Sequence, residues 1–467
     1  MENFVFENPT KVFFGKGCVR EYLSGLAAPY QGRPMLAWGG GSIRRNGVYD
    51  EVCAALRATG RKIVEFSGIM STPTYKKVLE GAALARKENV GLIIAVGGGS
   101  VMDCCKAISI AARYDGDVWN DSWVKKGSFR GFEPLPLGIV VTVSGTGSEC
   151  NGGAVITNED LHMKTGRDYP ECNARFSLLD PSYTFSVPRF QMVSGAFDTL
   201  SHLMEIYFSA PGADNVSDDI SEALMRSVIR NLRAALRDEK DYTARSNLMW
   251  DATMAENRVV KLGKKTDFMC HMMEHQIGAY VNCNHGAGLA VLHPAYYRRI
   301  YKDGLAKFVR FAVSVWGIER GDMDDDALAL RGIDALASFI RDIGLPTTLR
   351  GSECDRGYGS QGHSGLGHGH ARLLPQAFPR RNLRSFPRVF LGGTTNERGG
   401  LRAAGRKYVT ELAYHGSGAR FWPLSSAQPP KAARKCTRAS GTCWKAIPCS
   451  TARACTRSFL TSQSPER

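Results

Sequence analysis

The chain has 467 residues, 43% of them hydrophobic, which allows two or three domains with a sizeable buried core. Its net charge of +15 lies almost wholly in residues 351–467, which carry 19 Lys and Arg against 5 Asp and Glu, whereas residues 1–350 carry 41 against 40. That basic stretch has no regularly interleaved aromatic residues and no nucleic-acid-binding motif, so we expect neither nucleic acid nor a membrane as an evolved partner.

Localisation signals are missing as well. There is no run of about 18 uncharged apolar residues, and the N-terminus lacks the charged start, apolar core and cleavage site of a secretory signal. The 13 cysteines follow no disulfide-framework spacing. These features predict a protein of the reducing cytoplasm.

Residues 1–187 have the pattern of an α/β domain. Apolar runs such as GLIIAVG (91–97) and PLGIVVTV (136–143) alternate with helical patterns such as TYKKVLEGAALARKENV (74–90). This alternation predicts a parallel sheet of buried strands between helices. At the start of the chain, FVFENPTKVFFG (4–15) suggests a hairpin suited to pairing with a second copy.

A glycine turn, MLAWGGGSIRRNG (35–47), follows what the pattern gives as the first strand. In dinucleotide-binding domains an acidic residue at this place grips the adenosine ribose and excludes a 2′-phosphate. Here the turn has no carboxylate, and Arg44 and Arg45 follow it, which favours NADPH because guanidinium groups attract phosphate. If the two arginines are ordinary solvated residues, NADH remains possible.

A second glycine turn lies in GLIIAVGGGSVMDCCKA (91–107), between a strand and a helix. Gly97, Gly98 and Gly99 let the backbone approach a phosphate, and the helix N-terminus offers free N–H groups. The pattern differs from the usual GxGxxG fingerprint, and such turns also serve as tight connections. Together, the two turns predict a nucleotide site.

From residue 188 to residue 350 the pattern is helical. DDISEALMRSVIRNLRAALR (218–237) and DDDALALRGIDALASFIRDIG (324–344) carry apolar residues at spacings of three and four. We therefore expect an α/β domain at 1–187 and a helical domain at 188–350.

Residues 351–467 lose this order and are rich in Arg, Ser, Pro and Gly, as in disordered segments. One alternative is a disordered basic tail. The other is a shifted reading frame, because permitted codons for residues 351–370 can encode EVNATEDMEAKATRAWAMA when read one nucleotide later. That peptide has a Thr followed by acidic residues and a helical pattern. We favour a tail that is out of frame, with the native C-terminal helices missing.

Metal-binding side chains cluster in two stretches, although the chain has only 10 histidines. GAFDTLSHLMEIYF (195–208) places Asp198 and His202 four apart, on one helix face. In HMMEHQIGAYVNCNHG (271–286), His271 and His275 are also four apart, and His285 follows in a loop bounded by glycine. One carboxylate with three imidazoles suits Fe(II) or Zn(II), although histidine pairs four apart are often incidental.

These motifs, in this order, resemble the iron-containing (group III) alcohol dehydrogenases, in particular their butanol dehydrogenase and aldehyde reductase branch. The resemblance covers about residues 1–350 and rests on FENPTKVFFGKG, GGGSIRRNGVYDEV, AVGGGSVMDCCKA, TVSGTGSE, LLDPSYTFSVP, FDTLSH, HMMEH and NCNHGAGLAVLHP. It implies an N-terminal parallel-sheet nucleotide-binding domain followed by a helical metal-binding domain.

By position, the resemblance implies metal ligands at Asp198, His202, His271 and His285. It places His275 near the nicotinamide and substrate, where it assists proton movement or, alternatively, orients a ligand. Expected cofactor contacts fall in the two turns and beyond them, at Gly39, Gly40, Ser42, Gly98, Gly99, Ser100, Asp103, Thr142, Ser144, Thr146, Val155 and Lys164. The family's Asn-Pro turn reads Thr72-Pro73 here.

The expected activity is hydride transfer between NADPH, or NADH, and a primary alcohol or aldehyde such as butanol or butanal. A glycerol-type polyol dehydrogenase on the same fold is the first alternative, and an inactive frameshifted product or pseudo-enzyme is the second. We also expect a homodimer or larger homo-oligomer, as is common in the family.

Overall fold

The computed structural model describes residues 1–125, 132–210, 212, 214–280 and 283–348. The predicted out-of-frame tail, 351–467, lies outside them. In the described part, no helix has both the length and the apolar character that crossing a bilayer requires.

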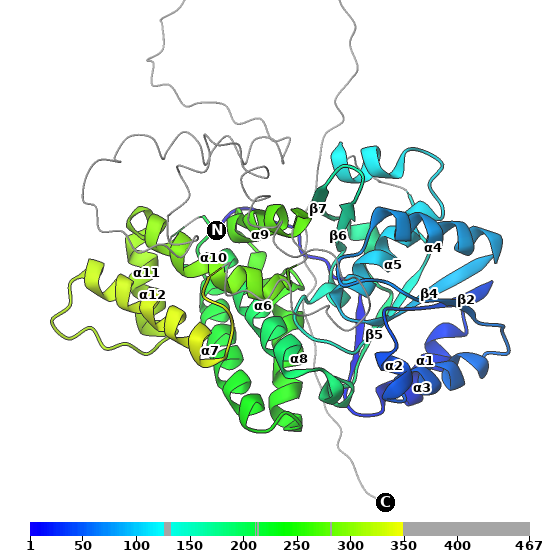
Figure 1. Cartoon of the computed structure of the whole chain (residues 1–467), viewed down its shortest axis with the longest axis horizontal. Coiled ribbons are helices and arrows are strands. Elements are labelled where there is room, and N and C mark those ends of the chain that lie inside the picture. The colour runs from blue at the N-terminus through cyan, green and yellow to red at the C-terminus, as the bar shows by residue number, and fades with distance from the viewer. Residues whose placement is uncertain (126–131, 211, 213, 281–282, 349–467) are drawn as a thin grey trace, which may run out of the picture. The chain divides into compact units, whose positions relative to one another are not determined.

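A six-stranded sheet forms the first part of the chain (Figure 1). Its neighbouring strands all pair in parallel, as the continuous apolar runs predicted. In spatial order the strands are β1 (Lys11–Phe14), β8 (Phe176–Leu179), β5 (Leu137–Val141), β4 (Val90–Gly97), β2 (Arg33–Trp38) and β3 (Val64–Phe66). A separate antiparallel hairpin joins β6 (Gly153–Asn158) to β7 (Met163–Asp168).

Helices cover both faces of this sheet, and each face has its own apolar core. One core includes α1 (Cys18–Ala27) and α3 (Val48–Arg57), and the other includes α4 (Tyr75–Lys87) and α5 (Gly99–Ala111). The short α2 (Ser42–Arg45) follows β2. In Figure 1 the two pairs lie on opposite sides of β2 and β4.

The N-terminal hairpin expected for residues 4–15 is wrong. Residues 1–10 form no strand, and Lys11–Phe14 instead adds to the sheet edge as a parallel partner of β8. The Asn8 amide donates to the carbonyls of Cys150, at 2.9 Å, and Asn257, at 3.2 Å, so the segment before β1 is tied to the rest of the chain. The first glycine turn therefore follows β2, which is the second strand in chain order and not the first.

The second part is helical and shares one apolar core. Its helices are α6 (Arg189–Tyr207), α7 (Val216–Arg237), α8 (Tyr242–Glu256), α9 (Met269–Tyr280), α10 (His285–Ile300), α11 (Leu305–Ser314) and α12 (Asp325–Asp342). The predicted helical stretches 218–237 and 324–344 correspond to α7 and α12. Side-chain caps explain where both begin, since Asn215 accepts from the backbone N–H of Asp218 and Asp324 from that of Ala327.

Short helical turns connect these elements: η1 (Trp119–Val124), η2 (Ser148–Cys150), η3 (Pro170–Cys172), η4 (Pro181–Ser186), η5 (Val259–Lys261) and η6 (Tyr301–Gly304). The change from strands to helices falls after η4, close to the predicted position 188. The sheet and the helical part contact each other, because the Thr199 hydroxyl of α6 donates to the carbonyl of Gly145, which follows β5, at 2.9 Å. The division into domains at 187 and 188 stays a prediction.

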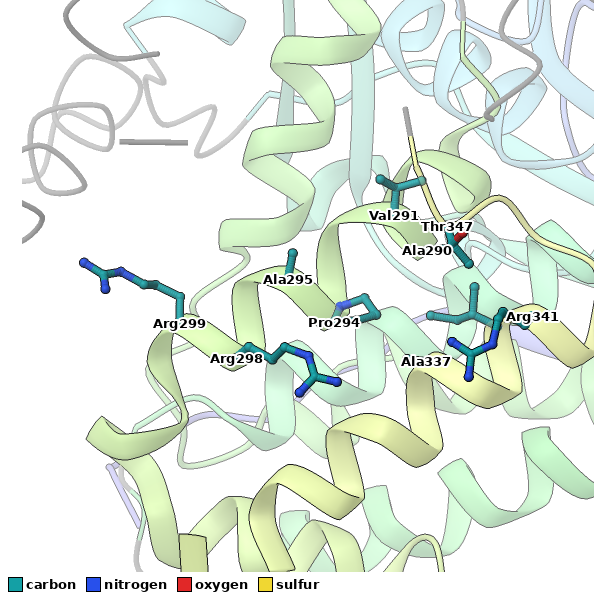
Figure 2. A pocket seen from close by; sticks show the side chains of 10 residues that line it. Ala290, Val291, Pro294, Ala295, Arg298, Arg299, Ala337, Arg341 and Thr347 are labelled. Atoms are coloured by element: carbon teal, nitrogen blue, oxygen red, sulfur yellow. The ribbon is translucent and has the colours of Figure 1, made fainter. Parts of the chain in front are cut away.

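A hollow lies between α10 and α12, close to where the described residues end (Figure 2). Its floor is apolar, and arginines stand at its rim. The lining residues are Ala290, Val291, Pro294, Ala295, Arg298, Arg299, Ala337, Ile340, Arg341 and Thr347. None of them is one of the predicted metal ligands.

Candidate metal centre

Three helices bring the four predicted metal ligands together. Asp198 and His202 lie on the same face of α6, as their spacing predicted, and His271 lies on α9. His285 is the first residue of α10, where a loop was expected. The correction has two causes: the Asn284 side chain caps α10, and a Cβ on Gly286 would meet the Ser194 carbonyl oxygen at 2.1 Å, so the helix begins directly against α6.

The four side chains converge on one Asp198 oxygen. From Asp198 Oδ1 the distance is 3.5 Å to His271 Nε2, 3.6 Å to His285 Nε2 and 3.9 Å to His202 Nε2. Donor atoms about 2.1 Å from a four-coordinate ion stand about 3.4 Å apart, so the three distances from Asp198 fit a divalent metal. The donor atoms of Asp198, His202 and His271 also lie within 4.8 Å of one another, whereas His285 groups in the same way with Glu274 and His275.

Unsatisfied polar atoms support this fit. Asp198 Oδ1 and His271 Nε2 are both buried, and neither has a hydrogen-bond partner among the described residues. A buried polar atom without a partner is costly unless something else, such as an ion, binds it. The donor set therefore has the composition, the spacing and the unmet bonding capacity of a metal site.

Two carboxylates behind the histidines orient them. Glu205 accepts from His271 Nδ1, and also from the backbone N–H of Cys270 at 2.6 Å. Glu274 accepts from His285 Nδ1 at 2.5 Å. Because each Nδ1 donates to a carboxylate, each Nε2 is left to face the cluster, as is usual for metal-bound histidine.

Sequence analysis missed these two carboxylates, although their spacing carried a signal. Glu205 follows Asp198 by seven residues, two helical turns on, and Glu274 follows His271 by three. Both stretches quoted for the ligands, GAFDTLSHLMEIYF and HMMEHQIGAYVNCNHG, contain the carboxylate.

The electrostatics place most of the cluster in forms that a metal requires. Burial raises the pKa of Asp198, but the neighbouring imidazoles of His202 and His285 outweigh this and hold it at about 2. Burial lowers the pKa of His202 to about 4, so its ring is neutral. Burial also lowers the pKa of His271, but Glu205 and Asp198 reverse this and raise it to about 10. Metal binding would therefore release a proton from His271.

His275 lies one turn beyond His271 on α9 but outside the cluster. Its ring centroid is 5.8 Å from that of His285, and its buried Nδ1 has no hydrogen-bond partner among the described residues. Burial lowers its pKa well below the usual value. No hydrogen bond in the described part joins His275 to the four converging residues, which weighs against a role in orienting them.

The two predicted glycine turns have the expected strand–turn–helix form. Gly97 ends β4, and Gly98 precedes α5. A Cβ on Gly97 would meet Val101 at 2.5 Å, and one on Gly99 would meet Thr146 at 2.4 Å, so packing itself requires glycine at both positions. In the first turn, by contrast, Gly40 has nothing within 4 Å of its Cβ position and is exposed.

The arginines after the first turn differ from each other. The Arg44 guanidinium lies 4.1 Å from the Tyr49 ring centroid and 2.9 Å from Glu65 Oε2, so this chain already engages it. Arg45 is exposed, and no salt bridge joins it to a carboxylate in the described part. Its Nη1 lies 3.0 Å from the Cβ position of Gly41, beside the turn. Of the two arginines that were expected to attract a phosphate, Arg45 is therefore the better candidate.

The remaining predicted cofactor residues lie around the ends of β4 and β5 and on the β6–β7 hairpin. Ser100 bonds to the Ser71 carbonyl. Asp103 uses both carboxylate oxygens within the chain, accepting from Ser148 Oγ at 2.7 Å and from the Val155 N–H at 2.9 Å. Thr142, Ser144 and Thr146 follow β5, Val155 lies on β6 and Lys164 on β7. Asp103 therefore holds the hairpin through its side chain.

Lys106 is a further residue that sequence analysis missed. It is fully buried, and its ammonium donates to the carbonyl oxygens of Ser148, at 2.6 Å, and Gly153, at 2.8 Å. It therefore ties α5 to the start of β6. Its place three residues after Asp103, on the same helix, was the available signal.

Comparison with known proteins identifies the family of this chain. The family described as "Iron-containing alcohol dehydrogenase" matches residues 9–181, and "Fe-containing alcohol dehydrogenase family, C-terminal" matches residues 192–358. NADH-dependent butanol dehydrogenase A of Clostridium acetobutylicum is 38% identical over 351 residues, 75% of this chain and 89% of that protein. NADPH-dependent aldehyde reductase YqhD of Escherichia coli is 33% identical, over 75% of this chain and 89% of its own.

A solved structure gives the same result. The crystal structure of NADH-dependent butanol dehydrogenase A from Thermotoga maritima is 38% identical, with a TM-score of 0.71, and the match covers 75% of this chain and 86% of that one. The two family matches together span both the sheet and the helices that carry the four converging residues. The chain therefore belongs to the iron-containing alcohol dehydrogenase family.

Proposed function

We propose that this chain is a metal-dependent alcohol dehydrogenase or aldehyde reductase that transfers a hydride between NAD(P)H and a primary alcohol or aldehyde such as butanol or butanal. The observation that carries the proposal is the approach of His202, His271 and His285, each through Nε2, to one oxygen of Asp198. Bound in place, a divalent ion supplies Lewis acidity to the substrate oxygen and the nicotinamide supplies the hydride.

The four converging residues are the proposed ligands of Fe(II) or Zn(II), since imidazole and carboxylate donors suit both ions. Glu205 and Glu274 hold two of the imidazoles in the orientation that binding needs. Metal analysis of protein reconstituted with each ion, with activity measured alongside, distinguishes the two.

His275 is the proposed proton carrier of the site. It is buried beside His285, and its free Nδ1 leaves it able to exchange a proton with substrate or water. A His275→Gln variant should keep its metal but lose turnover and change its pH–rate profile. An orienting role predicts weaker metal binding instead.

For the cofactor, we propose NADPH as the preferred nucleotide, with NADH also used. The turns at Gly39, Gly40 and Ser42 and at Gly98, Gly99 and Ser100 are its proposed phosphate and ribose contacts, and the other contacts are Asp103, Thr142, Ser144, Thr146, Val155 and Lys164. Arg45, beside Gly41 and without a carboxylate partner in the described part, supports attraction of a 2′-phosphate.

We also propose that residues 351–467 are out of frame. One peptide that permitted codons can encode in the shifted frame, EVNATEDMEAKATRAWAMA, begins acidic and then presents Met, Ala and Trp at helical spacing. It suits the hollow between α10 and α12, whose floor is apolar and whose rim carries Arg298, Arg299 and Arg341 (Figure 2). The hollow also opens beside Thr347, where such a segment would enter. Restored, the helix should raise the melting temperature by several degrees; an unchanged value contradicts this assignment.

The decisive experiment measures aldehyde-dependent oxidation of NADPH and NADH by metal-reconstituted protein, with the frame-restored chain beside the chain as written. We expect butanal to be reduced and glycerol to be a poor substrate for the reverse reaction. Preference for glycerol would favour the polyol dehydrogenase alternative. Absence of metal binding by both chains would contradict the proposal. We also propose that the protein is cytoplasmic and forms a homodimer or a larger homo-oligomer. Light scattering measures the size of the assembly.

A further inference from the structure

Glu274 lies between the β6–β7 hairpin, which carries the proposed cofactor residues Val155 and Lys164, and the four proposed metal ligands. Its side chain is fully buried, and it belongs to α9, between β7 and the start of α10. One carboxylate oxygen, Oε2, contacts both Lys164 Nζ of β7, at 3.1 Å, and His285 Nδ1 of α10, at 2.5 Å. A single atom thus joins a lysine of the first part of the chain to a proposed metal ligand of the second.

Two glycines leave room for this bridge. A Cβ on Gly278 would lie 2.9 Å from Lys164 Nζ and 3.3 Å from Glu274 Oε1. A Cβ on Gly288 would lie 3.0 Å from Glu274 Cγ. Because side chains at either position would press on the bridge, α9 and α10 hold the carboxylate closely on two sides.

The charges of the bridge are matched. The Lys164 ammonium lies 3.1 Å from Glu274 Oε2, and the His285 Nδ1 lies 2.5 Å from the same oxygen, so two donors face one buried carboxylate. The Lys164 side chain is 10% exposed, so little water screens the pair. Desolvated, geometrically defined pairs of this kind are sensitive to the loss of either partner.

The bridge continues into the nucleotide half. Lys164 pairs in register with Thr157 of β6, and Asp103 of α5 accepts from the backbone N–H of Val155, also on β6. Asp103 follows the second glycine turn by four residues. A continuous set of contacts therefore runs from that turn, through the hairpin and Glu274, to His285.

The other outer carboxylate makes no such connection. Glu205 accepts from His271 Nδ1 and from backbone N–H groups of Cys270 and His271, all within the helical part. Among the described residues, Glu205 makes no hydrogen bond to the hairpin. The chain thus supplies an internal comparison: two carboxylates with the same task on the histidines, of which Glu274 alone reaches the nucleotide side.

We propose that Glu274 is a positioning residue that couples the nucleotide-binding hairpin to the metal centre through Lys164. The proposal rests on the proposed function, since it needs a metal at the cluster. Any change in the position of Lys164 moves or reorients the acceptor of His285, and this alters how firmly His285 presents Nε2. Because coupling between two sites is reciprocal, occupancy of the metal centre also fixes the hairpin.

The test measures the dissociation constant for Zn²⁺ alone, by chelator competition, on the full chain. Glu274→Gln keeps the shape of the side chain but removes its charge, and we expect Zn²⁺ binding to weaken about tenfold or more. Lys164→Met should weaken binding severalfold, although Lys164 touches none of the proposed ligands. The double variant should be no weaker than Glu274→Gln alone, because both changes break one connection.

Two controls separate coupling from general damage. Lys76 forms an exposed ion pair with Asp160, in the turn of the same hairpin, so Lys76→Met should leave Zn²⁺ affinity unchanged. Glu205→Gln should weaken Zn²⁺ binding, but its effect should add to that of Lys164→Met. Far-UV circular dichroism and melting temperature confirm that each variant is folded.

A second readout is the affinity for NADPH, from nucleotide fluorescence, with and without Zn²⁺. In the wild-type chain Zn²⁺ should change this affinity, and in Glu274→Gln the change should disappear. The coupling is overturned if Lys164→Met binds Zn²⁺ within about twofold of wild type, or if its effect adds fully to that of Glu274→Gln. A wild-type chain that binds no Zn²⁺ would instead contradict the proposed function itself.

Discussion

The two halves of the molecule build their sites from different materials. In the helical half, ionisable side chains are withdrawn from water and face one another: Asp198, Glu205, His271 and Glu274 each expose 6% or less of their surface. In the sheet half, the turns at 39–42 and 97–100 present glycine backbone, and the first of them contains no carboxylate.

The contrast shows how each half is expected to fail. A site made of buried side chains is lost when one of them is removed, because its partners are left unpaired. A site made of glycine backbone is lost when a side chain is added, because the ligand can no longer approach. Apart from the connection through Lys164 and Glu274, substitutions in one half should therefore leave binding in the other half largely intact.

The largest expected effect comes from His271→Ala. Removing one proposed ligand should weaken metal binding and lower turnover about a thousandfold or more, equivalent to about 4 kcal/mol of transition-state stabilisation. NADPH binding, measured by fluorescence, should persist. His162→Asn, an exposed histidine in the hairpin turn that has a positive φ of 48°, is the matched control. Full activity of His271→Ala with metal still bound would break the comparison.

A second prediction concerns a buried carboxylate away from the cluster. Asp251 on α8 is 5% exposed, its Oδ2 lacks a hydrogen-bond partner among the described residues, and burial raises its pKa to about 7. Unfolded Asp titrates near 3.9, so its contribution to stability is complete below about pH 4 and is lost as the pH rises through about 7. Asp251→Asn should therefore be more stable than wild type at pH 8, by on the order of 4 kcal/mol in the free energy of unfolding.

The stability difference should shrink toward pH 4, where Asp251 is protonated in both states. Thermal melts across pH 4 to 8 measure it. Asp342→Asn, on the exposed last turn of α12, provides the control for removal of a surface carboxylate. A constant difference for Asp251→Asn would show that this side chain does not retain its proton on folding.

A smaller effect is expected in the sheet half from Gly40→Ala. Nothing lies within 4 Å of the added methyl, and Gly40 does not have positive φ, so stability should be unchanged. NADPH affinity should nevertheless fall about tenfold if the backbone contacts the nucleotide, while Zn²⁺ affinity stays the same. Gly25→Ala, within α1 and equally free of contacts, is the control. Unaltered nucleotide affinity would remove the first turn from the cofactor site.

The smallest effect concerns cofactor preference. Arg45→Ala should weaken NADPH several-fold, up to about tenfold, and leave NADH unchanged, because only NADPH carries the 2′-phosphate. Arg44→Ala should change the ratio of the two affinities less, since Glu65 already pairs with Arg44. Equal losses for both nucleotides would exclude Arg45 as the discriminating residue.

Much of this arrangement could be predicted from local sequence. The spacing of four between Asp198 and His202 placed both on one face of α6, because a helix repeats every 3.6 residues. The apolar runs before the glycines predicted the strands before both turns. Apolar residues at spacings of three and four predicted α7 and α12. Each of these features depends on residues close together in the chain.

What could not be predicted depends on residues far apart in the sequence. His285 begins α10 because Asn284 caps the helix and Gly286 packs on Ser194, a residue of another helix. Arg44 pairs with Glu65, whereas the adjacent Arg45 has no carboxylate partner in the described part of the chain. The two arginines therefore differ although they are neighbours in sequence. The N-terminal segment is held by the contacts of Asn8 with Cys150 and Asn257, and it does not form the hairpin that its local sequence suggested.

The sequence by itself therefore determined the chemistry available: one carboxylate and three imidazoles, of which Asp198, His202 and His271 lie on predictable helix faces, and two glycine turns after predictable strands. Tertiary structure decided how these are connected. It turned two imidazoles toward the cluster through Glu205 and Glu274, and it placed Lys164 against a carboxylate 110 residues away. The physical reason is that backbone hydrogen bonding and side-chain periodicity act locally, whereas pairing of buried charges requires that packing first bring distant elements together.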